Sequence, residues 1–103
     1  MRGARVIPKA YVIVHYTFLD SEAFTCGYAS KVEETIVASG GRFLVRGNEV
    51  AYGEGEAHAD LHVVVEFPSR EAALTWKTSD AYQAIEQART NNATGPFIII
   101  DGV

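Results

Sequence analysis

Residues 9–17 read KAYVIVHYT, a run dominated by β-branched and aromatic side chains. Such a run is typical of a β-strand. Asp20 follows at the position of a helix N-cap, where its carboxylate can accept a bond from an unpaired backbone N–H. The helix expected there has one apolar stripe with a period of four residues, formed by Phe24, Tyr28, Val32 and Ile36. Gly40-Gly41 ends this helix, because glycine accepts the left-handed backbone of a C-terminal cap.

The rest of the chain continues the alternation of strands and helices. We expect a strand at 42–47, a turn or bulged hairpin arm at 48–57, a strand at 61–67, helices capped by Ser69 and Ser79, a loop at 91–95 and a last strand at 97–100. This order predicts an α+β, ferredoxin-like βαββαβ fold. One domain over residues 1–103 then contains a four-stranded antiparallel sheet with both helices on one face.

The composition narrows the classes of function. The chain has 103 residues and a formal net charge of −4 without a dense basic run, which argues against nucleic-acid binding. It has no apolar run long enough for a membrane helix and no convincing signal peptide, so we expect a cytoplasmic protein without membrane contact. Cys26 is the one cysteine, which excludes an internal disulfide and a cysteine zinc site. No cofactor is expected.

The predicted sheet has one face without helices. An apolar sheet face is costly in water, and two such faces can cover each other. A domain of this size also gains from extra burial. We therefore expect a homodimer.

Side chains alternate between the two faces of a strand, and this places the polar residues of the three strands. The wholly apolar sets belong under the helices. The mixed sets belong on the opposite face, and they comprise Tyr11, His15, Arg42, Arg46, His62 and Glu66. A mostly apolar cavity with a few polar groups is the usual form of a small-ligand site, so this face is the predicted pocket. The prediction depends on register, because a one-residue bulge exchanges the faces.

Each of these residue types suggests a role. His15 and His62 are acid–base candidates, and Glu66 is the carboxylate that would orient one of them. Arg42 or Arg46 would hold an anion, with Tyr11 and Tyr28 as further contacts to the substrate. The structural alternatives are arginine salt bridges to Glu54, Glu56 or Glu66, two partly exposed histidines, and core tyrosines.

A metal site is a further possibility that we weigh against the geometry of a strand. His58 together with His15 and His62 would supply three histidines. The spacing of four residues between His58 and His62 does not converge on a metal in an extended chain as it would on a helix. No metal site is predicted.

Three segments carry a resemblance to a known family. They are 9–24, the stretch Gly-Gly-Arg-Phe-Leu-Val-Arg-Gly at 40–47 with Glu54-Gly55, and Glu66-Phe67-Pro68-Ser69 followed by Trp76, Ser79, Tyr82-Gln83-Ala84-Ile85 and Arg89. In these the chain resembles the family called domain of unknown function 1330. The resemblance implies a dimeric α+β barrel, a superfamily of cofactor-independent monooxygenases, isomerases, cyclases, haem-dependent enzymes and ligand sensors. His15 and His62 are not the residues that the resemblance leads us to expect at their positions.

Two classes of function follow. The first is an enzyme without a bound organic cofactor, an isomerase, cyclase or monooxygenase, acting on an acidic or enolisable small molecule. The second is a non-catalytic, ligand-binding or stress-associated homodimer that uses the same cavity. A purely structural protein is a weaker third reading, because the mixed face carries more polar groups than a plain interface needs.

Overall fold

The computed structural model describes residues 6–55 and 59–103. The strands are β1 (Ala10–Phe18), β2 (Arg42–Gly47), β3 (Leu61–Phe67), β4 (Ala93–Thr94) and β5 (Phe97–Asp101). The helices are α1 (Ser21–Phe24), a π-helical turn η1 (Thr25–Ala29), α2 (Ser30–Ala38), α3 (Arg70–Lys77) and α4 (Asp80–Asn92). Within these residues, no helix has the length and apolar character that crossing a membrane requires.

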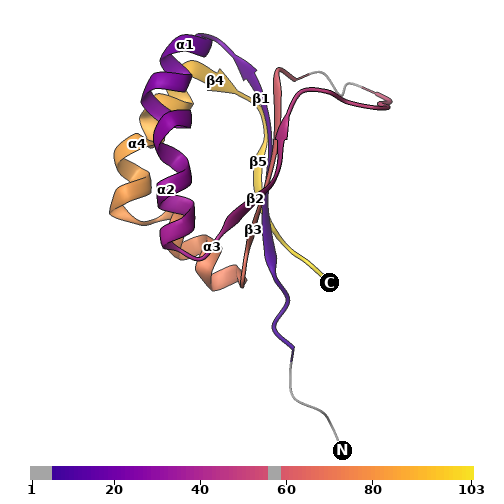
Figure 1. Cartoon of the computed structure of the whole chain (residues 1–103), viewed down its shortest axis with the longest axis vertical. Coiled ribbons are helices and arrows are strands. Elements are labelled where there is room, and N and C mark those ends of the chain that lie inside the picture. Colours follow the sequence, from indigo (N-terminus) through magenta and orange to yellow (C-terminus); the bar gives the residue numbers. More distant parts are fainter. Residues whose placement is uncertain (1–5, 56–58) are drawn as a thin grey trace, which may run out of the picture.

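The strands form an antiparallel sheet in which β1 is central. The order is β2-β3-β1, and β4 and β5 both pair with the free side of β1. Every helix lies on one face of the sheet, and the opposite face carries none (Figure 1). This is the predicted ferredoxin-like βαββαβ arrangement, and the α+β fold is confirmed.

The predicted helix boundaries rest on side-chain caps that the structure contains. The side chains of Asp20, Ser69 and Ser79 accept bonds from the backbone N–H groups three residues further on. Each therefore satisfies a donor that a helix N-terminus leaves unpaired. Gly40 has a φ of 84°, the left-handed backbone that ends α2.

Two local predictions need correction. The expected loop at 91–95 is mostly regular secondary structure, because α4 continues to Asn92 and residues 93–94 pair with the end of β1 as β4. Of the two alternatives for 48–57, a turn or a bulged hairpin arm, the second is wrong, because the bulge lies earlier, inside β2, where the register shifts between Phe43 and Val45. Within 48–55 and 59–60 the chain forms no strand, and residues 56–58 lie outside the described part.

The core lies between the sheet and the helices. The predicted apolar stripe of the first helical run is fully buried, as are Val12 and Val14 of β1. Trp76, at 1% exposed, is the largest buried side chain, and its indole N–H donates to Thr35 Oγ1 at 2.9 Å. The sheet face without helices instead exposes apolar residues, with Val45 46%, Ile98 46% and Ile100 49% accessible.

Candidate functional site

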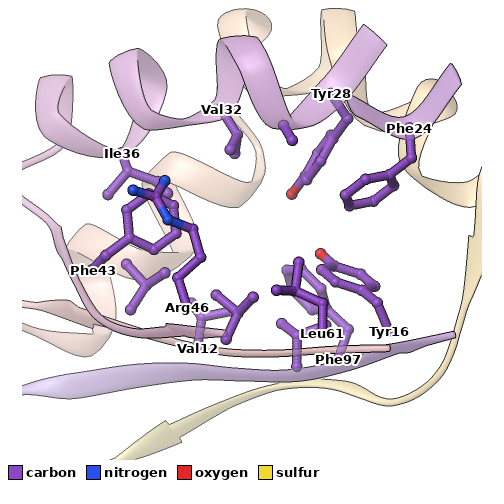
Figure 2. Close-up of a pocket in the computed structure, with 14 residues that line it drawn as sticks. Val12, Tyr16, Phe24, Tyr28, Val32, Ile36, Phe43, Arg46, Leu61 and Phe97 are labelled. Carbon is purple, nitrogen blue, oxygen red and sulfur yellow. The ribbon is translucent and has the colours of Figure 1, made fainter. Parts of the chain in front are cut away.

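A small cavity of about 50 Å³ lies between the helix-covered face of the sheet and the run η1–α2. Its walls are almost entirely apolar, and Figure 2 shows the side chains that converge on it from both layers. The helical wall consists of Phe24, Tyr28, Ala29, Val32 and Ile36, and the sheet supplies Val12, Val14, Tyr16, Phe43, Arg46, Leu61, Val63, Val65 and Phe97. This apolar cavity is therefore under the helices and not on the open face.

Arg46 reaches this cavity because of the bulge in β2. Arg42 pairs with Glu66 in the strand register, whereas Arg46 pairs with Val63. Glu66 belongs to the open face and Val63 to the helix-covered face. The prediction that Arg42 and Arg46 share a face is therefore wrong, and the extra residue at Leu44 is the physical reason.

Arg46 stands at the edge of the cavity, on an edge strand of the sheet. Its guanidinium carbon lies 4.1 Å from the centre of the Phe43 ring, and its Nη1 lies 3.8 Å from Glu33 Oε1 on α2. Half of the Arg46 side chain is exposed, as is more than half of the Glu33 side chain. An ion pair at that distance and exposure adds little stability. An anionic ligand can therefore replace Glu33 as the partner of Arg46 at a small cost in free energy.

The polar end of the cavity consists of tyrosine hydroxyls. Figure 2 shows the hydroxyl oxygens of Tyr16 and Tyr28 directed toward each other from the sheet and the helix. The Tyr28 hydroxyl also lies 2.9 Å from that of Tyr82. Tyr28 belongs to the π-helical turn η1, a rare geometry that is frequent at functional sites.

Burial keeps these phenols protonated. It raises the pKa of Tyr16 to about 12, an effect that a hydrogen bond with Tyr28 reduces only in part. Burial likewise raises the pKa of Tyr28 and of Tyr82. At neutral pH the cluster therefore offers neutral O–H donors, which suit a carbonyl or oxyanion of a ligand and do not act as bases.

The tyrosine cluster predicts a late alkaline transition. An exposed tyrosine ionises near pH 10. Between pH 10 and 12 the unfolded chain has lost the Tyr16 proton that the folded chain keeps, so stability falls as the pH rises. A spectrophotometric titration at 295 nm should show that part of the tyrosine signal appears only together with loss of far-UV circular dichroism. Ionisation of all five tyrosines near pH 10 with the helices intact would contradict this burial.

Two of the three histidines, His15 and His62, lie on the opposite face of the sheet. His15 and His62 are cross-strand partners in the β1–β3 register, and their Nδ1 atoms are 2.8 Å apart. The sheet separates them from the cavity. Their predicted acid–base role stays a prediction, and a ligand held beside Arg46 is out of their reach.

Glu66 pairs with cations and not with a histidine. Its carboxylate accepts from Arg42 Nε at 3.0 Å, from the Tyr11 hydroxyl at 3.4 Å and from Lys9 Nζ at 3.5 Å. Desolvation alone would raise the pKa of this carboxyl, but the bond from Arg42 and the charge of Lys9 outweigh it and lower the pKa. The salt-bridge alternative therefore describes Arg42, with Glu66 as its partner.

The predicted site residues thus form two groups. Tyr11, His15, Arg42, His62 and Glu66 lie on the open face, and Tyr28 and Arg46 lie at the cavity. The sequence offered Tyr16 and Tyr82 as possible hydroxyl donors, with Tyr82 at the pocket edge or in the core, but they were not among the candidate site residues. The available signal was that Tyr16 lies on the same strand face as Val12 and Val14, opposite the stripe that contains Tyr28.

A family model matches residues 9–103, and its description is domain of unknown function DUF1330. The crystal structure of RPA0582, a protein of unknown function from Rhodopseudomonas palustris, superposes with a TM-score of 0.76 at 15% identity. That match covers 96% of this chain and 85% of RPA0582. SnoaB, a cofactor-independent oxygenase from Streptomyces nogalater, has a TM-score of 0.61 at 8% identity, covering 93% of this chain and 94% of SnoaB. The curated proteins contain no match.

Proposed function

The chain belongs to the DUF1330 family, and we propose that its cavity binds a small, flat, apolar molecule with one anionic end. The observation that carries the proposal is the make-up of the cavity: apolar walls, tyrosine hydroxyls at one end and Arg46 at the edge. A mostly apolar cleft with a few convergent polar groups is the form that small-ligand sites take.

The dimensions restrict the ligand. A cavity of about 50 Å³ is far smaller than the roughly 300–1,000 Å³ of sites for drug-sized molecules. The ligand is therefore at most a single ring or a short branched chain, and a ring requires the walls to move apart, because an apolar cavity that binds benzene measures about 150 Å³. Its apolar part lies against Val32 and Phe97, and its charged end stays at the half-exposed Arg46.

The charged end of the ligand can be tested with benzoate and its neutral analogue benzamide. We expect benzoate to raise the melting temperature by an amount that grows with the logarithm of its concentration once this exceeds Kd, and benzamide to do so much less. Arg46→Gln should weaken benzoate binding about tenfold or more, since a hydrogen bond to a charged group contributes about 1.5–3 kcal/mol.

Arg42→Gln is the matched control, because Arg42 lies on the same strand but on the other face of the sheet. It should leave benzoate affinity unchanged. Equal losses in both variants, or equal binding of benzoate and benzamide, would contradict a cavity site anchored by Arg46.

A second candidate function is cofactor-independent oxygenation of a small enolisable molecule. SnoaB, which shares the fold, is such an oxygenase. The tyrosine cluster supports the proposal for this chain, because neutral phenols can stabilise by hydrogen bonds an enolate that forms by loss of a proton to solvent. Oxygen uptake with single-ring enolisable ketones should then be detectable and should fall in Tyr28→Phe. If such ketones bind but no oxygen is taken up, oxygenation is excluded and only the ligand-binding function remains.

The predicted homodimer is part of the proposal. Val45, Ile98 and Ile100 are exposed on the sheet face that no helix covers, and the register places Val64 and Ile13 between Val45 and Ile98. This apolar row supports pairing with a second copy. Ile98→Asp should convert a dimer at micromolar concentration into a monomer, as sedimentation or light scattering would show. Leu74→Asp, at a similarly exposed position on α3, should leave the dimer intact. If the wild-type chain were still a monomer at a concentration 100-fold above the micromolar range of this assay, the dimer proposal would be wrong.

A further inference from the structure

The two histidines on the open face of the sheet form a close pair. His15 lies directly opposite His62 in the β1–β3 register. Their ring centres are 5.0 Å apart, the planes are inclined by 74°, and the two Nδ1 atoms are separated by 2.8 Å. Nothing in the proposed ligand site uses these rings, since the cavity lies on the other face of the sheet.

The short distance between the two nitrogens fixes their protonation. One Nδ1 must carry a hydrogen and donate it, while the other offers its lone pair. A metal ion can take the place of that hydrogen if both Nδ1 atoms present lone pairs. The displaced proton then moves through solvent to Nε2 of the same ring, so both imidazoles remain neutral and both become ligands.

The spacing of the two nitrogens is compatible with several metals, and the order of affinities decides among them. An imidazole nitrogen lies about 2.0–2.1 Å from a first-row divalent ion, so two nitrogens at a right angle are about 2.9 Å apart and two at a tetrahedral angle about 3.3 Å apart. The 2.8 Å between the hydrogen-bonded nitrogens is slightly shorter than either distance, so a small movement of the rings admits an ion in either geometry. Right-angle coordination by nitrogen and oxygen is typical of Cu²⁺, which is also the ion that such ligands bind most tightly in the first-row series.

We propose that His15 and His62 form a two-nitrogen chelate for Cu²⁺, and more weakly for other borderline divalent cations. The strands hold the pair in place through the flanking cross-strand partners Val14–Val63 and Tyr16–Leu61. Only rotation of two side chains is then needed to direct both lone pairs at one ion. Residues 6–55 and 59–103 offer no set of three histidine, cysteine or carboxylate ligands, so water, or a group of the second copy that the proposed dimer places against this face, completes the coordination.

The experiment is a titration of the full chain with Cu²⁺. Calorimetry measures the affinity, and electron paramagnetic resonance counts the bound nitrogens. All variants carry Cys26→Ser, because the exposed thiol would itself bind or reduce Cu²⁺. His15→Ala and His62→Ala should each weaken Cu²⁺ binding about tenfold or more, since the second ligand of a chelate acts at high effective concentration. The resonance spectrum should show two bound nitrogens in the parent and one in each variant.

His58→Ala is the control histidine and should retain the affinity and the two-nitrogen spectrum of the parent. Equal affinity in the parent, His15→Ala and His62→Ala would overturn the chelate, as would a loss in His58→Ala equal to that in His15→Ala. His15→Gln and His62→Gln provide the same comparison should an alanine variant not fold. Benzoate binding should be unchanged in all of them, so the failure of this site and of the cavity site are distinguishable.

Discussion

We expect Gly95→Ala to lower the free energy of unfolding by about 3 kcal/mol or more, which corresponds to a fall in melting temperature of about 12 °C or more in a domain of this size. Gly95 has a φ of 126°, a backbone conformation that alanine rarely adopts. A Cβ placed on it would lie 1.8 Å from the carbonyl oxygen of His15. That oxygen belongs to the backbone of the central strand, so it cannot give way as a flexible side chain would.

The consequence should extend to the sheet. His15 N donates to Pro96 O at 3.2 Å, next to the substituted position. Moving the turn away from β1 breaks that bond and disturbs the pairing of Val14 with Phe97. Phe97 lines the cavity, so the variant should also bind benzoate less well. Thermal or urea unfolding measures the first effect, and calorimetry measures the second.

Two other glycines are matched controls for Gly95. A Cβ on Gly47 or on Gly55 has no neighbour within 4 Å. Gly47→Ala should change the unfolding free energy by no more than about 0.5 kcal/mol, as surface substitutions usually do. Gly55→Ala should cost about 1 kcal/mol, because its φ of 71° is positive. If Gly95→Ala cost no more than Gly55→Ala, the close approach to His15 would not exist in solution.

Alternation explains which parts of the site were predictable. In β1 and β3 every second residue is apolar, and the structure buries Val12, Val14, Val63 and Val65 while leaving His15 exposed and His62 half-buried. The alternation in β1 and β3 shows which face of the sheet is buried, and the apolar stripe of the first helical run shows which side of that helix packs on it. The faces of β1 and β3 could therefore be predicted from the sequence.

Strand β2 shows where alternation loses its information. Phe43, Leu44 and Val45 are three successive apolar residues between two arginines, and nothing in that run marks the position at which a bulge adds a residue. The bulge at Leu44 adds one residue, and this moves Arg46 to the opposite face from Arg42. An error of one residue in one strand thus divided the predicted pocket between two faces.

The two close contacts of the site also lay beyond sequence reasoning, for a different reason. His15 and His62 were predicted to share a face, but their direct opposition depends on the register of β1 with β3. The contact between the Tyr28 and Tyr82 hydroxyls depends on how η1 and α4 pack. Distances between elements that are far apart in the chain follow from packing and not from local pattern.

We expect Trp76→Ala to be the second severe substitution, with a loss of about 3–5 kcal/mol, as is usual when a large buried aromatic is truncated. Trp76 packs against Tyr82, Phe67 and Phe97, with ring-centre distances of 4.3, 5.3 and 6.3 Å. Trp76→Phe keeps part of this packing but removes the N–H that donates to Thr35, so it should cost an intermediate amount. Leu74→Ala, on the exposed side of the same helix, should cost less than about 1 kcal/mol.

A comparison of Trp76→Ala with Arg46→Gln distinguishes a residue that holds a wall of the cavity in place from a residue that binds the ligand. Trp76 lies behind Phe97, a wall of the cavity, without lining it itself. Trp76→Ala should therefore weaken benzoate binding and lower the melting temperature together, because the wall loses its backing. Arg46 is half-exposed and its ion pair with Glu33 is long, so Arg46→Gln should weaken benzoate binding at nearly constant melting temperature. If both variants changed affinity and stability in the same proportion, Arg46 would be a structural residue and the ligand would have no charged anchor in this cavity.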